Sequence, residues 1–383
     1  MALAFAINGL VYANWTSRLP RLQEVYGIDN GQTGFVLTCL AVGGLIAMPL
    51  AGVLIVRYGS RGLAIASTLL FIVAVPLMAY MPGYYALLAV VPLVGVSTGV
   101  MDVAMNAQAV EVEQRWGSPI TSSFHACFSA GMFLGAGTAA GFISLGYDVG
   151  PHLVTISLVT CLLSAYALRH FLRDGASPEE SASGRKFGTA IILLGMASLC
   201  TMIGEGSMAD WTPLYMTRVT GSAEYLAPLG QAAFSGAMLV GRGVGDRVRA
   251  RSGSRAVIVG GAGIALTGVL LAIVFPVAWV AITGFGLVGL GLSNVVPVLF
   301  SEASRIPGLR AGVGISSVST IGYSAFLFGP PLIGFVADYQ NALLPEGMAL
   351  FPGIAGLRVG LGVVALLMAA LIFLGTFFLR VSD

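Results

Sequence analysis

The sequence predicts an all-α membrane protein with twelve transmembrane helices, arranged as two pseudo-symmetric six-helix bundles. Of its 383 residues, 57% are hydrophobic and only 9% are charged, which is too little polar surface to cover a water-soluble domain of this size. Long apolar runs recur along the chain, and about twenty helical residues suffice to cross the hydrocarbon core of a bilayer. The runs are continuous rather than alternating, which favours helices over a β-barrel.

An internal repeat predicts the two bundles. The block Ala13-Asn14-Trp15-Thr16 returns as Ala209-Asp210-Trp211-Thr212, a shift of 196 positions (13 to 209). Two further blocks return at a shift of 194 (59 to 253 and 93 to 287): Gly59-Ser60-Arg61 as Gly253-Ser254-Arg255, and Leu93-Val94-Gly95 as Leu287-Val288-Gly289. Three matches at nearly one offset indicate homologous halves, and the tryptophan-containing block is the most specific of them.

The apolar runs give approximate bounds for the spans. In the first half these are residues 1–18, 31–56, 63–81, 84–112, 120–145 and 151–173, and in the second half 187–216, 226–248, 256–274, 277–303, 312–338 and 353–380. We therefore expect an N-terminal bundle over residues 1–173 and a C-terminal bundle over 187–383, joined by a flexible polar linker at 174–186. Because the first span starts later in its repeat than the seventh, the completeness of the N-terminus is left open.

Small residues and prolines predict how the helices pack and where one of them bends. Glycines four apart, such as Gly131 with Gly135, Gly137 with Gly141 and Gly241 with Gly245, let helices approach closely in lipid. In the eleventh span, Gly329-Pro330-Pro331 predicts a break or kink. The four cysteines all fall within spans, where we expect small packing residues rather than disulfides.

The distribution of basic residues predicts the orientation in the membrane. With the N-terminus inside, fourteen arginines and lysines fall in inner loops, and only Arg18, Arg21, Arg218 and Arg358 fall outside. Short cytoplasmic loops retain basic residues, so we expect both termini in the cytoplasm. The net charge of +2 then reflects topology and gives no reason to expect nucleic acid as a partner.

These features together resemble the major facilitator superfamily. The turn from Gly52 to Arg61 is similar to that superfamily's loop between its second and third spans, with Arg57 and Arg61 as candidates for the inner gate. Val56 stands where the family usually has an aspartate. More closely, a set of motifs resembles a bacterial branch related to fucose permease: Asp102-x3-Asn106, His125, Glu205-Gly206-Ser207-x2-Asp210-Trp211 and Gly241-Arg242. The resemblance implies a secondary transporter of the bacterial inner membrane and does not name a substrate.

Ionisable residues inside the spans are the candidates for coupling, because each costs at least about 2.5–3.5 kcal/mol to place in hydrocarbon. Asp102 and Asn106 share one helical face. They are candidates for a proton carrier and a solute contact, and the alternative is a structural hydrogen bond. His125 is a candidate for a proton relay or a solute contact. The structural alternative is a neutral imidazole that donates a hydrogen bond to a backbone carbonyl. Glu205 and Asp210 replace Gly9 and Asn14 of the first repeat, so the seventh span carries two acids that its counterpart lacks.

The other polar candidates have structural alternatives. Asp210 has two interpretations: a role in coupling, or an outer-gate ion pair with Arg18 or Arg358. Arg242 and Asp246 are one turn apart, and a simple intrahelical pair explains them. Five further residues are candidates for the solute cavity, although the tryptophans are also common membrane-interface anchors. They are Asn14, Trp15, Trp211, Asn294 and Tyr323.

No nucleotide-binding loop, metal-ligand spacing or nucleophile motif occurs in the sequence, so we expect neither an enzyme nor a metal or cofactor. The sequence favours a monomeric secondary active transporter, a proton symporter of a small polar solute that works by alternating access. An exporter of drugs or metabolites is the first alternative. The second is a sensor, channel or assembly protein that does not transport.

Overall fold

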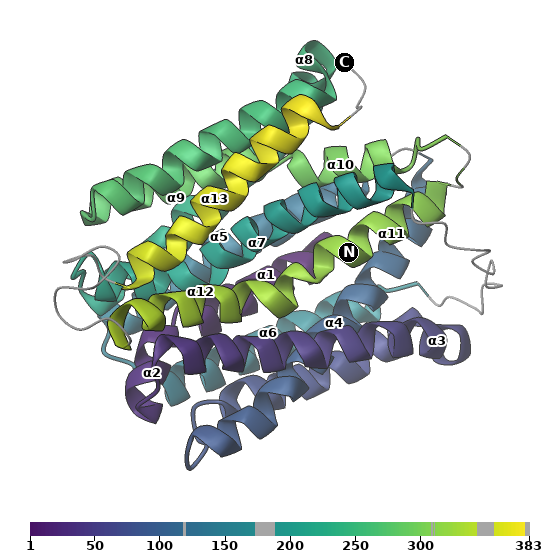
Figure 1. Cartoon of the computed structure of the whole chain (residues 1–383). Coiled ribbons are helices and arrows are strands. Elements are labelled where there is room, and N and C mark those ends of the chain that lie inside the picture. Colours follow the sequence, from purple (N-terminus) through teal and green to yellow (C-terminus); the bar gives the residue numbers. More distant parts are fainter. Residues whose placement is uncertain (118–119, 173–187, 308, 310, 343–355, 380–383) are drawn as a thin grey trace. The chain divides into compact units, whose positions relative to one another are not determined.

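The computed structural model describes residues 1–117, 120–172, 188–307, 309, 311–342 and 356–379, and every regular element in them is helical. The chain divides into two compact units, Met1–Glu179 and Glu180–Asp383. The division falls in the predicted linker, residues 174–186, which lies outside the described residues. Figure 1 shows the helices of both units.

The first unit contains six helices: α1 (Ala2–Thr16), α2 (Leu19–Tyr26), α3 (Asn30–Leu77), α4 (Tyr84–Trp116), α5 (Thr121–Ser144) and α6 (Val149–Arg169). The second contains α7 (Thr189–Arg218), the 3₁₀ turn η1 (Glu224–Leu226), α8 (Pro228–Val274), α9 (Ala278–Leu292), α10 (Val295–Ala303), α11 (Ala311–Tyr323), α12 (Ala325–Ala342) and α13 (Gly356–Phe377). Each of the twelve predicted spans corresponds to helix in this order.

Ten helical segments of the described chain are long and apolar enough to cross a membrane. The two predicted spans outside this set are α1 and the first arm of α8. With 15 residues, α1 is about 22 Å long at 1.5 Å per residue, less than the hydrocarbon core of about 30 Å. The first arm of α8 carries the charged residue Arg242 within its length.

The repeat is visible in the turns within α3 and α8, the two longest helices (Figure 1). Gly59 interrupts α3 with φ 72° and ψ 156°, and Gly253 interrupts α8 with φ 78° and ψ 167°. A side chain would strain the backbone in this region, which glycine enters freely. Equivalent hydrogen bonds then fix both turns: Gln108 Nε2 donates to Ser60 Oγ over 2.7 Å, and Ser254 Oγ donates to Glu302 Oε1 over 2.7 Å.

Equivalent glycines also bring equivalent helices together. A Cβ atom at Gly95 would collide with the carbonyl of Leu40, and one at Gly289 with the carbonyl of Phe234. Both pairs are related by the shift of 194 (95 to 289 and 40 to 234). Van der Waals packing of backbones is a main source of helix association in lipid, so these contacts hold α3 against α4 and α8 against α9.

The glycine pairs singled out from the sequence behave differently from one another. Gly131 and Gly135 pack against the backbone of α1, and Gly241 and Gly245 pack against the residues between α9 and α10. A Cβ added at the other pair, Gly137 and Gly141, would have no neighbour within 4 Å, so these two do not mediate close packing in the described structure.

The break predicted in the eleventh span is displaced from the expected position. Helix α12 runs through Pro330 and Pro331 without interruption, and the break lies at Ser324, between α11 and α12. A proline ring crowds the carbonyl four residues earlier, so its effect falls about one turn before the ring itself. The tenth span is also broken, at Ser293 and Asn294 between α9 and α10, which the sequence did not lead us to expect.

A short helix that was not predicted, α2, follows α1. Pro20 lies in its first turn, and Gly27 ends it with φ 60°, both favourable positions for those residues. The Tyr26 hydroxyl donates to the Met78 carbonyl over 2.5 Å and accepts from the Met81 backbone N–H over 3.2 Å. These bonds tie α2 to the end of α3.

Candidate functional site

The predicted acid–amide pair on α4 forms a direct contact. Asn106 Nδ2 donates to the Asp102 carboxylate over 3.2 Å and to the Asp102 backbone carbonyl over 2.9 Å. Both side chains are half-buried. The structural alternative was a bond to a neighbouring span, whereas the bond found is made within one helical turn. Asp102 has no ion-pair partner in the described part of the chain.

In the second unit, Glu205 on α7 and Arg242 on α8 lie close enough for each charge to influence the other, without forming a direct ion pair between them in the described structure. Glu205 is half-buried near the middle of α7, and Arg242 is half-buried on the first arm of α8. The Asp246 side chain, which we expected as the partner of Arg242, lies outside the described residues. The sequence analysis did not pair Glu205 with Arg242, although an acid and a base buried on neighbouring helices each need a partner.

The residues at the break between α9 and α10 contact α8 at Gly241 and Arg242. Asn294 Nδ2 donates to the Gly241 carbonyl over 2.8 Å, and Arg242 Nε donates to the Ser293 carbonyl over 3.4 Å. Where a helix is interrupted, its backbone carbonyls become available to a neighbour. The predicted cavity residue Asn294 therefore uses its amide to hold α8, and the interrupted backbone helps to position Arg242.

Tyr323 belongs to the same region of the second unit. It packs against a small apolar cluster that contains Met202 and Ile203, within one turn of Glu205. Its ring lies 6.0 Å from that of Phe326, which in turn lies against Gly206. Three helices that are far apart in the sequence thus place Glu205, Arg242 and Tyr323 around the middle of α7.

A buried polar network in the first unit was missed by the sequence analysis. Arg18 Nε donates to His152 Nδ1 over 2.8 Å, and His152 Nε2 lies 2.8 Å from Asn14 Oδ1. All three side chains are at most 2% exposed. A guanidinium group cannot accept a hydrogen bond, so Nδ1 carries no proton and the neutral imidazole donates from Nε2 to Asn14.

Asn14 and Arg18 make further hydrogen bonds in this network. Asn14 Nδ2 donates to the Leu10 carbonyl over 2.8 Å and to Thr138 Oγ1 over 3.1 Å. Arg18 Nη2 donates to the Tyr147 carbonyl over 2.5 Å. These contacts join α1, α5, α6 and the α5–α6 turn. The only indication of them in the sequence was that a histidine and an arginine in neighbouring spans both require partners.

Arg358, a gate candidate, has a structural role. Its Nε and Nη2 donate to the Ile273 carbonyl over 2.8 and 2.5 Å. Ile273 lies at the end of α8, where backbone carbonyls lack a partner in their own helix. Arg358 therefore caps α8 and forms no ion pair with Asp210 in the described structure. Asp210 itself is 4% exposed.

The paired tryptophans are fully buried. Trp15 and Trp211 are each 1% exposed, and neither indole N–H has an acceptor among the described residues. Such burial does not fit anchors at a membrane surface. A buried N–H without an acceptor costs about 1–3 kcal/mol, so each indole carries an unmet hydrogen bond in the described structure. The ring of His125, by contrast, is exposed and meets Phe5 edge-on at 5.3 Å.

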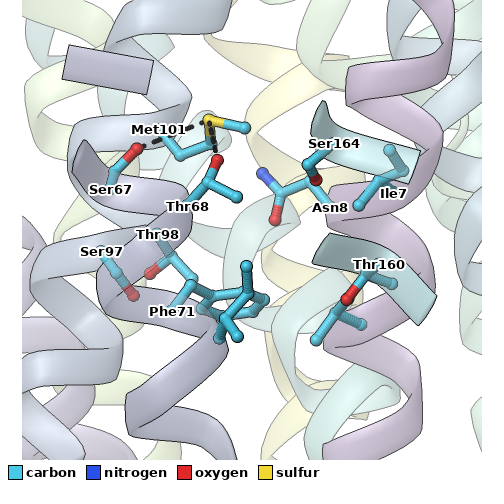
Figure 2. Close-up of a pocket in the computed structure, with 12 residues that line it drawn as sticks. Ile7, Asn8, Ser67, Thr68, Phe71, Ser97, Thr98, Met101, Thr160 and Ser164 are labelled. Carbon is cyan, nitrogen blue, oxygen red and sulfur yellow. Dashed lines mark hydrogen bonds between the residues drawn. The ribbon is translucent and has the colours of Figure 1, made fainter. Parts of the chain in front are cut away.

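The inner-gate candidates differ in their surroundings. The Arg57 guanidinium lies 5.3 Å from the ring centre of Tyr58 on the surface. Arg61 lines a cleft between α3 and α6 with a volume of about 260 Å³. Next to that cleft lies a small pocket of about 20 Å³, lined by Asn8 and by hydroxyl groups that include Ser97 and Thr98 (Figure 2). Its volume suits about one water molecule and excludes a solute.

Comparison with known families identifies the family of this chain. Residues 1–330 match the family model of the Major Facilitator Superfamily. The chain belongs to the major facilitator superfamily. Its resemblance to the branch related to fucose permease stays a prediction.

Relatives within the superfamily cover most of the chain. It is 36% identical to the membrane protein MosC of Rhizobium meliloti over 339 residues, 88% of this chain and 83% of that one. It is 34% identical to an uncharacterized MFS-type transporter of Yersinia pestis over 346 residues, 90% of each chain.

Solved structures of this superfamily share the fold at low identity. The nucleoside transporter NupG matches with a TM-score of 0.74 and 11% identity over 98% of each chain. A bacterial homologue of the human lysosomal transporter Spinster, in an inward-facing and occupied conformation, matches with a TM-score of 0.69 and 15% identity, over 98% of this chain and 94% of that one. This major facilitator protein is therefore a multi-pass membrane protein with a transporter fold.

Proposed function

We propose that this major facilitator protein is a proton-coupled symporter of a small polar solute in the bacterial inner membrane. It would act as a monomer, with both termini in the cytoplasm and with its two halves opening alternately to each side. The observation that carries the proposal is the interaction of Glu205 with Arg242 inside the second unit. Family membership supports transport in general.

The Glu205–Arg242 pair offers a way to exchange a proton for a solute. When Glu205 takes up a proton, its attraction to Arg242 is lost, and the positive charge of Arg242 then favours a polar or anionic group of the solute nearby. Two unit charges beyond direct contact, about 6–8 Å apart, attract by roughly 0.5–3 kcal/mol between the dielectric of water and that of a protein surface. Each 1.4 kcal/mol corresponds to a tenfold change in an equilibrium, so this exchange is large enough to couple the two binding events.

Asp102 supports a second protonation step in the first unit. The amide of Asn106 can donate to the carboxylate, as it does in the structure, and its carbonyl can accept from the protonated acid. The pair can therefore hold or release a proton without a counter-charge. Asp210 is a third candidate, because its equivalent in the first repeat is the neutral residue Asn14.

For the solute we propose contacts from the cavity candidates that the sequence predicts in each unit. They are Asn106, His125, Trp15, Trp211, Tyr323 and the remaining acceptor of Asn294. Asn14 and Arg18 support the site from the network with His152, because their polar groups bind other parts of the first unit. The switch between the two access states would then depend on which of these polar groups are hydrogen-bonded or ion-paired.

The test begins with identification of a solute. A thermal-shift screen of the purified protein against sugars, amino acids, nucleosides and organic acids at two pH values detects binding, since a ligand stabilises the state that binds it. The selected solute is then assayed in proteoliposomes, with and without a pH gradient. We expect Glu205→Gln and Asp102→Asn to lose gradient-driven accumulation while retaining exchange of labelled for unlabelled solute.

Glu111→Gln is the matched control, because Glu111 forms an exposed ion pair with Arg115 over 2.8 Å on α4. It should accumulate solute like the unmodified protein. Unchanged gradient-driven accumulation in Glu205→Gln, in Asp102→Asn and in the double variant would rule out proton coupling through these acids. A protein that binds solute but shows neither accumulation nor exchange would rule out transport itself.

A further inference from the structure

The cleft between α3 and α6 combines an apolar wall with two arginines at one end. Its apolar lining includes Ile65, Leu69 and Ile72 from the second arm of α3, together with Ala165 and Leu168 from α6. Arg61 and Arg169 complete the lining, and no acidic residue contributes to it. The cleft therefore has the two-part chemistry of an amphiphile, with positive charge beside a hydrocarbon surface.

The cleft is open to the outside of the helix pair. Ile65 and Leu69 remain 39% and 58% exposed, so apolar side chains on its rim are not covered by protein. Pockets that enclose a drug-sized solute measure about 300–1,000 Å³. At about 260 Å³ the cleft is smaller than this range, which suits part of a lipid held against the surface better than an enclosed solute.

The repeat shows that Arg61 is unusual. Its equivalent in the second unit, Arg255, donates to the carbonyls of Gly375 and Thr376 over 3.1 and 2.6 Å, at the end of α13. Arg61 makes no hydrogen bond or ion pair with any described residue, although it is half-buried. The same position thus caps a helix in one half and leaves a guanidinium free in the other.

Arg169 is positioned to bind the same group. Its guanidinium stacks over the ring of Tyr166 at 4.3 Å, on α6. Stacking occupies the face of the guanidinium and leaves the N–H groups at its edge free to donate. Two arginines with free N–H groups match the oxygens of a phosphate, which arginine binds in a bidentate manner.

We propose that this cleft binds one acidic phospholipid, with its phosphate between Arg61 and Arg169 and one acyl chain along Ile65, Leu69 and Leu168. Basic pockets between transmembrane helices are known to hold anionic headgroups. Thr68 and Ser164 form the inner wall, since they line both the cleft and the small pocket (Figure 2). This site is separate from the acids assigned to coupling and does not depend on the identity of the solute.

The test measures lipid binding to the full chain in detergent. Native mass spectrometry and thermal stabilisation are recorded with phosphatidylglycerol, phosphatidylcholine and inorganic phosphate as separate probes. Each arginine near an anionic surface contributes roughly a fivefold gain in affinity. We therefore expect the double variant Arg61→Gln, Arg169→Gln to bind phosphatidylglycerol about 25-fold more weakly.

The matched control removes two charges elsewhere, with Arg57→Gln and Arg251→Gln, both of which are exposed and outside the cleft. It should bind phosphatidylglycerol like the unmodified protein. Ala165→Trp keeps both arginines and fills the cleft, so it should also weaken binding, and it addresses the case in which the double variant does not fold. Arg61→Lys should restore part of the affinity that Arg61→Gln loses.

Three results would overturn the proposal. The first is equal loss of binding in the cleft and control variants, which indicates a nonspecific charge effect. The second is equal stabilisation by phosphatidylcholine, which indicates a general effect of lipid. The third is equal stabilisation by inorganic phosphate alone, which indicates an anion site without a lipid chain.

Discussion

Replacing His152 by phenylalanine tests whether the buried network organises the first unit. His152 is fully buried, and its ring stacks on Phe142 with centres 4.4 Å apart and an angle of 21° between the planes. Phenylalanine keeps the ring and this stacking, so the change removes mainly the hydrogen bonds. Arg18 Nε loses its acceptor at 2.8 Å, and Asn14 Oδ1 loses its donor at 2.8 Å.

The expected cost follows from these two bonds. The neutral bond to Asn14 contributes about 0.6 kcal/mol, the average for hydrogen bonds between membrane helices. The bond from the Arg18 guanidinium contributes about 1.5–3 kcal/mol, because it involves a charged donor that is buried. The sum is about 2–3.5 kcal/mol. For a unit of this size, a destabilisation of 1 kcal/mol lowers Tm by about 2–4 °C, so Tm should fall by roughly 4–14 °C.

The assay is thermal unfolding of the purified protein in one detergent, followed by tryptophan fluorescence. His170→Phe is the control, since His170 follows the same helix α6, is exposed and bonds only to the Tyr166 carbonyl within its own turn. It should change Tm by less than about 2 °C. The double variant His152→Phe, Arg18→Leu should lose little beyond the single variant, because the unpaired charge has been removed as well.

The reasoning fails if His152→Phe unfolds within about 1 °C of the unmodified protein. It also fails if the effects of His152→Phe and Arg18→Leu are additive, since two residues in one network should show a coupling energy.

Two further predictions concern packing and helix capping. Gly289→Ala should destabilise the second unit by about 1–3 kcal/mol in the same unfolding assay, because the new methyl group collides with the Phe234 carbonyl. Gly260→Ala is the control and should be neutral or slightly stabilising, because a Cβ there has no neighbour within 4 Å. Equal effects of the two substitutions would contradict the packing argument. The pKa of the Asp148 carboxyl is held below its usual value, first by a hydrogen bond from the Val149 backbone N–H and then by Arg21. A carboxyl whose pKa is lowered in the folded state contributes its full stability above the unfolded-state value near 3.9, and this contribution is lost as the pH falls through the folded-state pKa. Asp148→Ala should therefore lower Tm more at pH 7 than at pH 3, and an equal loss at both pH values would refute this.

Much of the fold follows from patterns that are local in the sequence. Hydropathy located all twelve helical spans, because a helix must satisfy its backbone within itself to enter lipid. The Gly-Ser-Arg repeat located both turns, since a positive φ selects glycine wherever it occurs. Asp102 and Asn106 were predicted as neighbours, because residues four apart share a helical face.

Only the tertiary structure decided which distant side chains meet. Arg18 and His152 are 134 positions apart, and neither has a neighbour in sequence that reveals the other. Glu205 and Arg242 likewise come near each other through the packing of α7 and α8, a proximity that spacing alone does not indicate, while the predicted partner Asp246 has its side chain outside the described residues. Arg61 and Arg255 both follow a Gly-Ser pair, yet one faces a cleft and the other caps a helix. Local periodicity determines where helices begin and end, but the pairing of polar groups in a membrane depends on which faces the packing brings together.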